Sequence, residues 1–457
     1  MYMKTILKHL HIALICAVIF TSCGRKNVAS NGNVDVASIP YHPLTSEQDL
    51  DVIMQQIGNA RVVLLGEASH GTSEYYQWRA AITKRLIQEK GFDFMGIEGE
   101  WADSYRVNNF IKGPKQDSTA AVNVLRNYDR WPTWMWGNYE IASLVTWLNN
   151  YNQSKPAAEK FGFYGLDVYC LWESTTELMP YIQGNDSLRN IALQVQQCFQ
   201  PFSADAQDYS YAVANASANC RAQTERLYNS IMNFTGNVTA RSEAPFVMQQ
   251  NALVALNGER YYRASISSYE ESWNIRDRHM MQTIRRLLEL HGGDSKMIIW
   301  EHNTHIGDAR FTDMAKEGLV NVGQLVREEY GQNNVYAVGF GSYQGTVIAS
   351  NSWGGATQRM PVPAAPSGSW EGMLHQLGAT NKIILSNEIK GNEALQKSVG
   401  HRAIGVVYHP GQEQGNYVPS IMPDRYDAFI FIDQTTALHP LNTQPRREPG
   451  DTYPSGY

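Results

Sequence analysis

Short apolar runs alternate with longer stretches of helical period in the first part of the chain. Apolar runs at 61–65, 92–97 and 161–166 predict strands, because each is short and lacks regular polar alternation. The stretches at 46–57, 74–90, 141–151 and from about residue 102 predict helices. Strands without polar alternation are typically buried on both faces, so this order indicates parallel strand–helix–strand units.

The pattern changes between residues 186 and 291, where strand signals are few. Helical periodicity there predicts helices at 187–200, 206–234, 243–264 and 273–291. Strand patterns resume at 296–300, 335–340, 346–349, 403–408 and 428–432. The glycines at both ends of 341–345 favour a hairpin between two of these strands. The predicted fold is therefore α/β, with a central, mostly parallel sheet flanked by helices and an inserted helical subdomain.

The N-terminus has the composition of a targeting segment. Lys4 and Lys8 precede an apolar run at 12–20 that is too short to remain as a membrane-spanning helix. The run ends at Cys23 in a sequence that resembles a lipoprotein signal, so we expect Cys23 to be acylated; a plain secretory signal is the alternative. Either signal places the mature protein outside the cytoplasm, in the cell envelope or periplasm. We expect it to reach the membrane only through the lipid on Cys23.

These patterns together predict the organisation of the chain. A signal peptide of lipoprotein type at 1–22 is followed by a tether at 23–45. The α/β catalytic domain comprises 46–185 and 292–435, and the helical subdomain 186–291 is inserted between its two parts. An irregular tail follows at 436–457.

Charge and cysteine content narrow the possible partners. The net charge of −6 over 457 residues provides no basic surface for nucleic acid. Beyond the leader, the cysteines are Cys170, Cys198 and Cys220, an odd number that leaves at least one thiol. Cys198 and Cys220 could pair in an oxidising compartment, but the sequence leaves this open. The absence of a CxxC pair argues against a structural zinc site.

Glutamate and histidine side chains follow three of the predicted strands. Glu67 and His70 come after 61–65, Glu98 ends the next strand, and His302 and His305 follow 296–300. The carboxyl ends of parallel strands meet at one edge of a sheet, where such folds bind ligands. A carboxylate beside an imidazole orients the ring and raises its basicity. We therefore predict that these five residues form a catalytic site.

Other chemistries are possible for the same residue types. Histidines and carboxylates also bind zinc, but the spacing contains no HExxH pattern, so we expect neither metal nor other cofactor. Ser69 is not in a GxSxG elbow, which favours water as the nucleophile. A purely structural role would have His70 bonded within a loop and Glu67 paired with an arginine.

We expect four further side chains to contact the substrate. Arg79 and Arg276 could anchor a carbonyl or stabilise an oxyanion, although most arginines lie at protein surfaces. Trp101 and Trp136 could form the pocket wall. The tryptophans of 131–136 fit a core layer as well as a pocket wall.

Several sequence blocks resemble the erythromycin esterase family over about residues 57–433. The blocks are 65–71 (LGEASHG), 96–101 (GIEGEW), 130–136 (RWPTWMW), 164–167 (YGLD), 300–307 (WEHNTHIG) and 402–408 (RAIGVVY). The resemblance implies a metal-independent hydrolase in which water opens the macrocyclic lactone of macrolide antibiotics. The chain looks closer to a broad branch of that family, whose members are not all macrolide esterases.

The same resemblance implies a role for each site residue. His70 would deprotonate water and Glu67 would orient it. Glu98, His302 and His305 would shape proton movement and bind the carbonyl, with Arg79 supporting them. The expected partner is a small ester or lactone. An envelope metallohydrolase and a non-catalytic binding lipoprotein are the alternatives on the same fold, and the sequence gives no oligomeric state.

Overall fold

The computed structural model describes residues 36–203 and 206–442. Nine strands form one sheet in the order β1-β8-β11-β6-β2-β5-β3-β4, with β7 paired to β6. The strands are β1 (His42–Pro43), β2 (Val62–Leu65), β3 (Phe94–Glu100), β4 (Gly162–Asp167), β5 (Met297–Trp300), β6 (Val335–Ala349), β7 (Gln358–Val362), β8 (Lys382–Leu385) and β11 (Ala428–Thr435); β9 (Val399–Arg402) and β10 (Tyr417–Ser420) pair separately.

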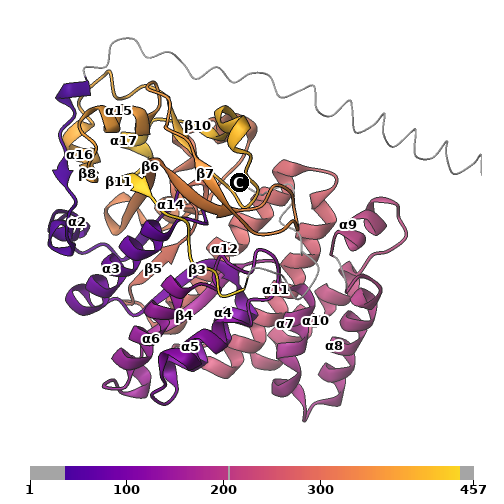
Figure 1. Ribbon diagram of the computed structural model, residues 1–457. Helices are drawn as coiled ribbons and strands as arrows, with labels where there is room; N and C mark the ends of the chain where they lie inside the picture. The colour runs from indigo at the N-terminus through magenta and orange to yellow at the C-terminus, as the bar shows by residue number, and fades with distance from the viewer. Residues whose placement is uncertain (1–35, 204–205, 443–457) are drawn as a thin grey trace, which may run out of the picture.

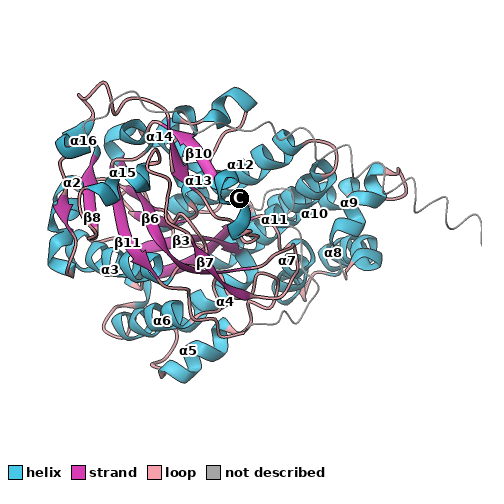
Figure 2. Cartoon of the chain, turned by 45° about the horizontal axis from the view of Figure 1, so that its top comes forward, coloured by secondary structure: helices cyan, strands magenta, loops and turns pink. Residues whose placement is uncertain are grey.

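The sheet is parallel from β11 through β6, β2, β5 and β3 to β4. Strands β1, β7 and β8 pair with their neighbours in antiparallel fashion at the margins. Helices surround the sheet (Figure 1, Figure 2). The predicted fold class, a mostly parallel sheet flanked by helices with an inserted helical subdomain, is confirmed.

The helices fall into three groups along the chain. Those of the first part are α2 (Asp51–Ile57), α3 (Ser73–Lys90), α4 (Trp101–Lys112), α5 (Ser118–Leu125), α6 (Tyr139–Asn152) and α7 (Leu171–Leu178). The middle group is α8 (Asp186–Phe199), α9 (Ala206–Ala214), α10 (Arg221–Thr235), α11 (Glu243–Ser265) and α12 (Tyr269–His291). The last group is α13 (Asn303–Ile306), α14 (Val322–Tyr330), α15 (Trp370–Gln376), α16 (Ser386–Ile389) and α17 (Met422–Arg425).

Both faces of the central strands are buried, as the uninterrupted apolar runs predict. Val63 and Leu65 of β2 lie in a core with α3 and α6, whereas Val62 and Leu64 lie in a second core with α12 and α14. Successive strand residues point to opposite faces, so one four-residue strand contributes to both cores. No helix in the described part of the chain combines the length and the apolar composition needed to cross a membrane.

The middle helices gather beside the sheet (Figure 1); α8 to α11 share a separate core with α7, whereas most apolar residues of α12 pack in the sheet core. The single helix predicted at 206–234 is wrong: it is divided into α9 and α10, with Ala216 between them at a φ of 55°. A disulfide joins Cys198, near the end of α8, to Cys220, which precedes α10, and their Cα atoms are 5.9 Å apart. The pairing left open by the sequence is therefore made. Cys170 is buried as a thiol.

The hairpin predicted around 341–345 is wrong, because β6 runs unbroken from Val335 to Ala349. Strand β11 lies beside this stretch, pairing Phe431 with Gly341 and Thr435 with Gly345. A Cβ at Gly341 would lie 2.6 Å from the Phe429 ring. This glycine therefore makes room for a neighbouring aromatic ring instead of forming a turn.

The strand predicted at 403–408 is also wrong. This segment makes only two isolated bridges, from Ile404 to Ser69 and from Val407 to Ser350. Its apolar residues cover the loop after β2, where the Ile404 amide donates to the Ala68 carbonyl at 2.7 Å. A segment that is buried over a loop has the same run of apolar residues as a strand that is buried in a sheet.

The ends of the described chain pack onto the sheet domain. Ile39 and Leu44, within the predicted tether, are buried, and β1 pairs with β8. Of the predicted tail, Ala437 and Leu438 are buried, and the Leu438 amide donates to the Gly71 carbonyl. The predicted signal peptide and Cys23 lie outside the described residues, and the division of the chain into domains stays a prediction.

Candidate active site

The polar groups predicted from the strand ends meet at one edge of the sheet. Strands β2, β5 and β3 are neighbours and parallel, so their carboxyl ends lie side by side. Glu98 lies near the end of β3, Glu67 and the segment 302–305 follow β2 and β5, and all are buried. The structure thus brings all five predicted catalytic residues together.

Glu67 holds His70 in a defined orientation. The Nδ1 atom of His70 lies 2.9 Å from Oε1 of Glu67, and Nη2 of Arg79 donates to the other carboxylate oxygen at 2.5 Å. A carboxylate accepts hydrogen bonds only, so Nδ1 of His70 carries the proton and Nε2 is left with its lone pair. A ring in this tautomer can take a proton at Nε2.

Arg79 supports this pair from behind. Its guanidinium lies between the rings of Tyr76 and Trp300, at 4.4 and 4.5 Å from their centroids, and is fully buried. Arg79 is not among the pocket-lining residues. Arg79 was predicted to contact the substrate, but it pairs with Glu67 instead. Its cation–π contacts compensate part of the hydration that the guanidinium loses on burial.

Arg276 is surrounded by acceptors. It donates to both oxygens of Asp167, at 3.0 and 2.7 Å, and to Oε1 of Glu98 at 2.7 Å. Glu98 also accepts the backbone amide of His302 at 2.7 Å. Burial alone would raise the pKa of Glu98, but His305 and Arg276 outweigh it and hold that pKa well below the usual range. Glu98 is therefore an anion beside His70.

His305 is held as an imidazolium. Burial lowers its pKa, but Asp277, whose carboxylate lies 3.0 Å from Nδ1, and Glu98 more than offset this and raise the pKa to about 10. The ring stacks on Trp273 with centroids 4.7 Å apart. Nε2 of His305 lies 3.4 Å from Oε1 of Glu98 and 3.1 Å from Nη1 of Arg276, and Arg276 opposes the rise in pKa.

The charge on His305 predicts how stability depends on pH. Its pKa is about 10 in the folded protein and near 6.5 when unfolded. Between these values the folded state binds the extra proton, so this contribution is complete below pH 6.5. Above that pH the free energy of unfolding falls by about 1.4 kcal/mol per pH unit. Urea titrations of wild type and His305→Gln from pH 6 to 9 measure the difference in slope; equal slopes would contradict the assignment.

His302 is neutral and has a free donor. Burial, and then the neighbouring His70, lower its pKa well below the usual range. The Thr304 amide donates to Nδ1, so Nε2 carries the proton. That Nε2 is buried and makes no hydrogen bond within the described residues. The backbone of Ala68 raises the pKa of the ring, against the effect of burial. The rings of His70 and His302 are 4.9 Å apart.

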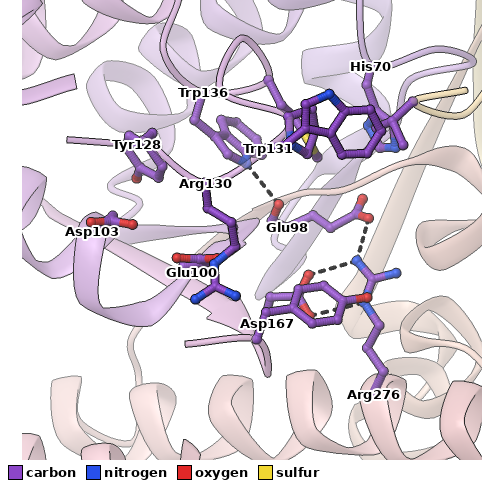
Figure 3. A pocket seen from close by; sticks show the side chains of 15 residues that line it. His70, Glu98, Glu100, Asp103, Tyr128, Arg130, Trp131, Trp136, Asp167 and Arg276 are labelled. Atoms are coloured by element: carbon purple, nitrogen blue, oxygen red, sulfur yellow. Dashed lines mark hydrogen bonds and ion pairs between the residues drawn. The ribbon is translucent and has the colours of Figure 1, made fainter. Parts of the chain in front are cut away.

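A pocket that is partly open to solvent adjoins these groups. Figure 3 shows Glu98 between Arg276 on one side and Trp131 and Trp136 on the other. The Trp136 indole donates to the Glu98 carbonyl at 2.8 Å. The pocket lining is mixed aromatic and charged, comprising His70, Glu98, Gly99, Glu100, Asp103, Tyr128, Arg130, Trp131, Pro132, Met135, Trp136, Asp167, Tyr169, Arg276 and Val406.

Trp136 and Arg276 therefore lie where substrate contact was predicted, whereas Trp101 does not. The Trp101 ring stacks on Tyr164 and Tyr105 in the core, away from the pocket lining. Trp101 begins α4 directly after Glu100, and the chain turns there from strand to helix. The turn directs the indole to the opposite side of the sheet edge from Trp136.

A second charged group lies further along the pocket wall. Arg130 forms ion pairs with Glu100 and Glu173 at 2.5 and 2.7 Å. Burial raises the pKa of Glu100 well above its usual range and that of Asp103 to about 6. Glu98 and Glu100 both face the pocket, because residues two apart on a strand point to the same side.

Sequence reasoning missed two carboxylates of this network. Asp167 is the last residue of β4, so the strand-end rule that found Glu98 also applies to it. Asp277 lies in the middle of α12, and no local pattern marks it. Among the described residues, no three His, Cys, Asp or Glu side chains are grouped to hold a metal ion.

The fold and the site define an α/β protein with a buried Glu–His base at the sheet edge. The family model for erythromycin esterase matches residues 87–435, so the chain belongs to the erythromycin esterase family. Erythromycin esterase type II of Escherichia coli is 23% identical over 381 residues, covering 77% of this chain and 87% of that protein. Membership indicates a hydrolase.

Two solved structures show the same fold. One, described as a succinoglycan biosynthesis protein, has a TM-score of 0.70 at 19% identity and covers 91% of this chain and 98% of its own. The other, a mutant of the erythromycin esterase EreC in its open conformation, has a TM-score of 0.64 at 15% identity. It covers 89% of this chain and 99% of its own.

Proposed function

We propose that the protein hydrolyses a carboxylic ester or lactone with a water molecule activated by His70. The observation that carries this proposal is the Nδ1 contact between His70 and Glu67, which leaves Nε2 as a base in a pocket-lining residue. No serine or cysteine is needed as a nucleophile in this scheme. Ser69 bonds to Thr72 behind the loop.

The reaction divides into two proton transfers. Water gives a proton to Nε2 of His70 while its oxygen bonds to the ester carbonyl carbon, and the carbonyl oxygen takes the negative charge. The carbon–oxygen bond to the leaving group then breaks, and that oxygen takes the proton back from His70. Glu67 stabilises the imidazolium between these steps, because the pair lies at 2.9 Å in a buried site.

Two groups near His70 fit the charge that develops on the carbonyl oxygen. Arg276 lines the pocket with a guanidinium, and the neighbouring His302, buried outside the pocket lining, has an Nε2–H with no hydrogen-bond partner among the described residues. A donor that is fixed before the reaction costs no reorganisation when the oxyanion forms. Glu98 keeps both in place through its contacts with the His302 amide and Arg276.

A macrolide antibiotic is the substrate to test first. Family membership supports this choice, and the pocket beside His70 has aromatic walls that can contact an apolar ring. Purified protein incubated with erythromycin is expected to yield a product heavier by one water, detected by mass spectrometry. Other macrolides and nitrophenyl esters form the comparison set.

The outcomes separate substrate from mechanism. Hydrolysis of nitrophenyl esters without attack on any macrolide would reject the macrolide and keep the ester hydrolase. No hydrolysis of any ester or lactone would reject the proposed function. Loss of activity on dialysis against a chelator, restored by zinc, would favour a metallohydrolase instead.

We further propose that the protein is exported and anchored at the envelope through Cys23. The Cys198–Cys220 disulfide supports export, because disulfides form and persist in oxidising compartments. Labelling of cells with a radioactive fatty acid, comparing wild type with Cys23→Ser, is expected to mark only the wild-type chain. Equal labelling of both would contradict acylation at Cys23.

A further inference from the structure

A second buried histidine–glutamate pair lies behind the active site. Nδ1 of His401 is 2.6 Å from Oε1 of Glu371, and both side chains are fully buried. Neither residue is in the lining of the pocket beside His70. His401 lies in β9, and Glu371 in α15 also accepts the Arg402 amide at 3.0 Å. The proposed reaction makes no direct use of this pair.

The other nitrogen of His401 points to the active-site segment. Nε2 lies 3.1 Å from Nδ2 of Asn303. The same Asn303 amide group donates to the Phe340 carbonyl at 2.6 Å, and its oxygen accepts the Phe340 amide at 3.2 Å. These two bonds to Phe340 fix which end of the Asn303 amide faces His401. His401 must therefore accept at Nε2 and carry its proton at Nδ1.

Asn303 is the link between the two halves of the site. It stands between His302 and His305 at the start of α13, and its backbone amide donates to the Glu67 carbonyl at 2.8 Å. The close approach requires Gly66, because a Cβ there would lie 2.1 Å from the Asn303 side-chain oxygen. Moving Asn303 therefore shifts the Glu67 loop relative to the two histidines.

We propose that His401 is a positioning residue that, through Asn303, sets the distance between the His70–Glu67 base and the His302–His305 segment. This inference rests on the proposed function for its kinetic readout. The contacts that position Asn303 run from Glu371 through His401 to the Asn303 side chain. This arrangement gives a role to His401, which directly precedes the 402–408 block and takes no part in the proposed proton transfers.

The charges around His401 favour the required tautomer. Burial lowers its pKa, with Arg425 and Arg402 acting in the same direction and Glu371 opposing them. The Tyr426 and Phe429 rings enclose the remaining edges. A neutral ring with an anionic acceptor at Nδ1 leaves Nε2 free to accept from Asn303. The Glu371 anion thus has the role of selecting the tautomer.

Two substitutions at His401 separate the two contacts. In His401→Gln the side-chain oxygen can reach the position of Nε2 and accept from Asn303. In His401→Asn the shorter amide can reach only the position of Nδ1 and donate to Glu371. Both variants remove the ring, and Asn fills less of its space than Gln by one methylene group. Ester hydrolysis is measured as kcat and KM for each.

We expect His401→Asn to lower kcat by about 10- to 100-fold with KM unchanged within a factor of two, and His401→Gln to retain most of the wild-type kcat. KM should hold because no residue of this chain of contacts lines the pocket. Equal losses of kcat in both variants, or a rise in KM alone, would overturn the proposal. So would full activity in both.

A measurement that needs no activity distinguishes this inference from the proposed function. Imidazole nitrogen NMR of the wild-type protein should show His401 protonated at Nδ1 only, from pH 6 to 8. In His401→Asn the resonances of His302 and His305 should shift, whereas in His401→Gln they should stay in place. If the protein proves inactive on every ester, these shifts still test the link; their absence in both variants would reject it.

Discussion

Replacing His70 with alanine is expected to lower kcat for ester hydrolysis by about 10²- to 10⁴-fold, the usual contribution of a general base. The ring is the pocket's only side chain that pairs with Glu67 among the described residues, and no neighbour can replace its Nε2. KM should change little, because the aromatic walls remain. Steady-state kinetics on the best nitrophenyl ester or macrolide provide the measurement.

A matched control is available in His409, an exposed histidine outside the pocket lining. His409→Ala should keep wild-type kcat. Glu67→Gln should lower kcat as well, because an amide can stabilise either tautomer of His70 and carries no charge to balance the imidazolium. Full activity in His70→Ala would reject His70 as the base.

Replacing Arg276 with methionine is expected to lower the free energy of unfolding by about 3–5 kcal/mol, because it leaves buried carboxylates without their cation. Arg276 donates to Asp167 and Glu98, and all three side chains are buried. Urea denaturation at pH 7 measures the loss. The exposed Arg278 on the same helix is the control, and Arg278→Met should change stability by less than about 0.5 kcal/mol.

Relieving one of the stranded charges should restore part of this stability. Asp167→Asn added to Arg276→Met removes one buried anion, so the double variant is expected to be more stable than Arg276→Met alone. A single variant within 1 kcal/mol of wild type would show that water or the His305 cation compensates the carboxylates. That result would contradict the central place given to Arg276.

The sequence was sufficient to predict the parallel core and the meeting of its strand ends. Uninterrupted apolar runs such as Val62–Leu65 are typical of strands that are buried on both faces. Parallel pairing then brings Glu67, Glu98 and His305 to one edge whatever the details of the loops. The rule is topological, so it does not depend on knowing any side-chain contact.

The predictions failed where tertiary packing determines the conformation. Gly341 resembled a turn residue but accommodates the Phe429 ring from a strand about 90 positions later. The apolar segment 403–408 is buried over the Ala68 loop instead of within the sheet. Asp277 is one acidic residue among several on α12, and only the fold places it against His305. Local patterns carry no information about partners so distant in sequence.

The catalytic turn is closed by the far end of the polypeptide. The Ile404 amide bonds to Ala68, and the Leu438 amide bonds to Gly71, so the turn that carries His70 is fixed by residues more than 330 positions later. A chain still emerging from the ribosome lacks both bonds until synthesis is nearly complete.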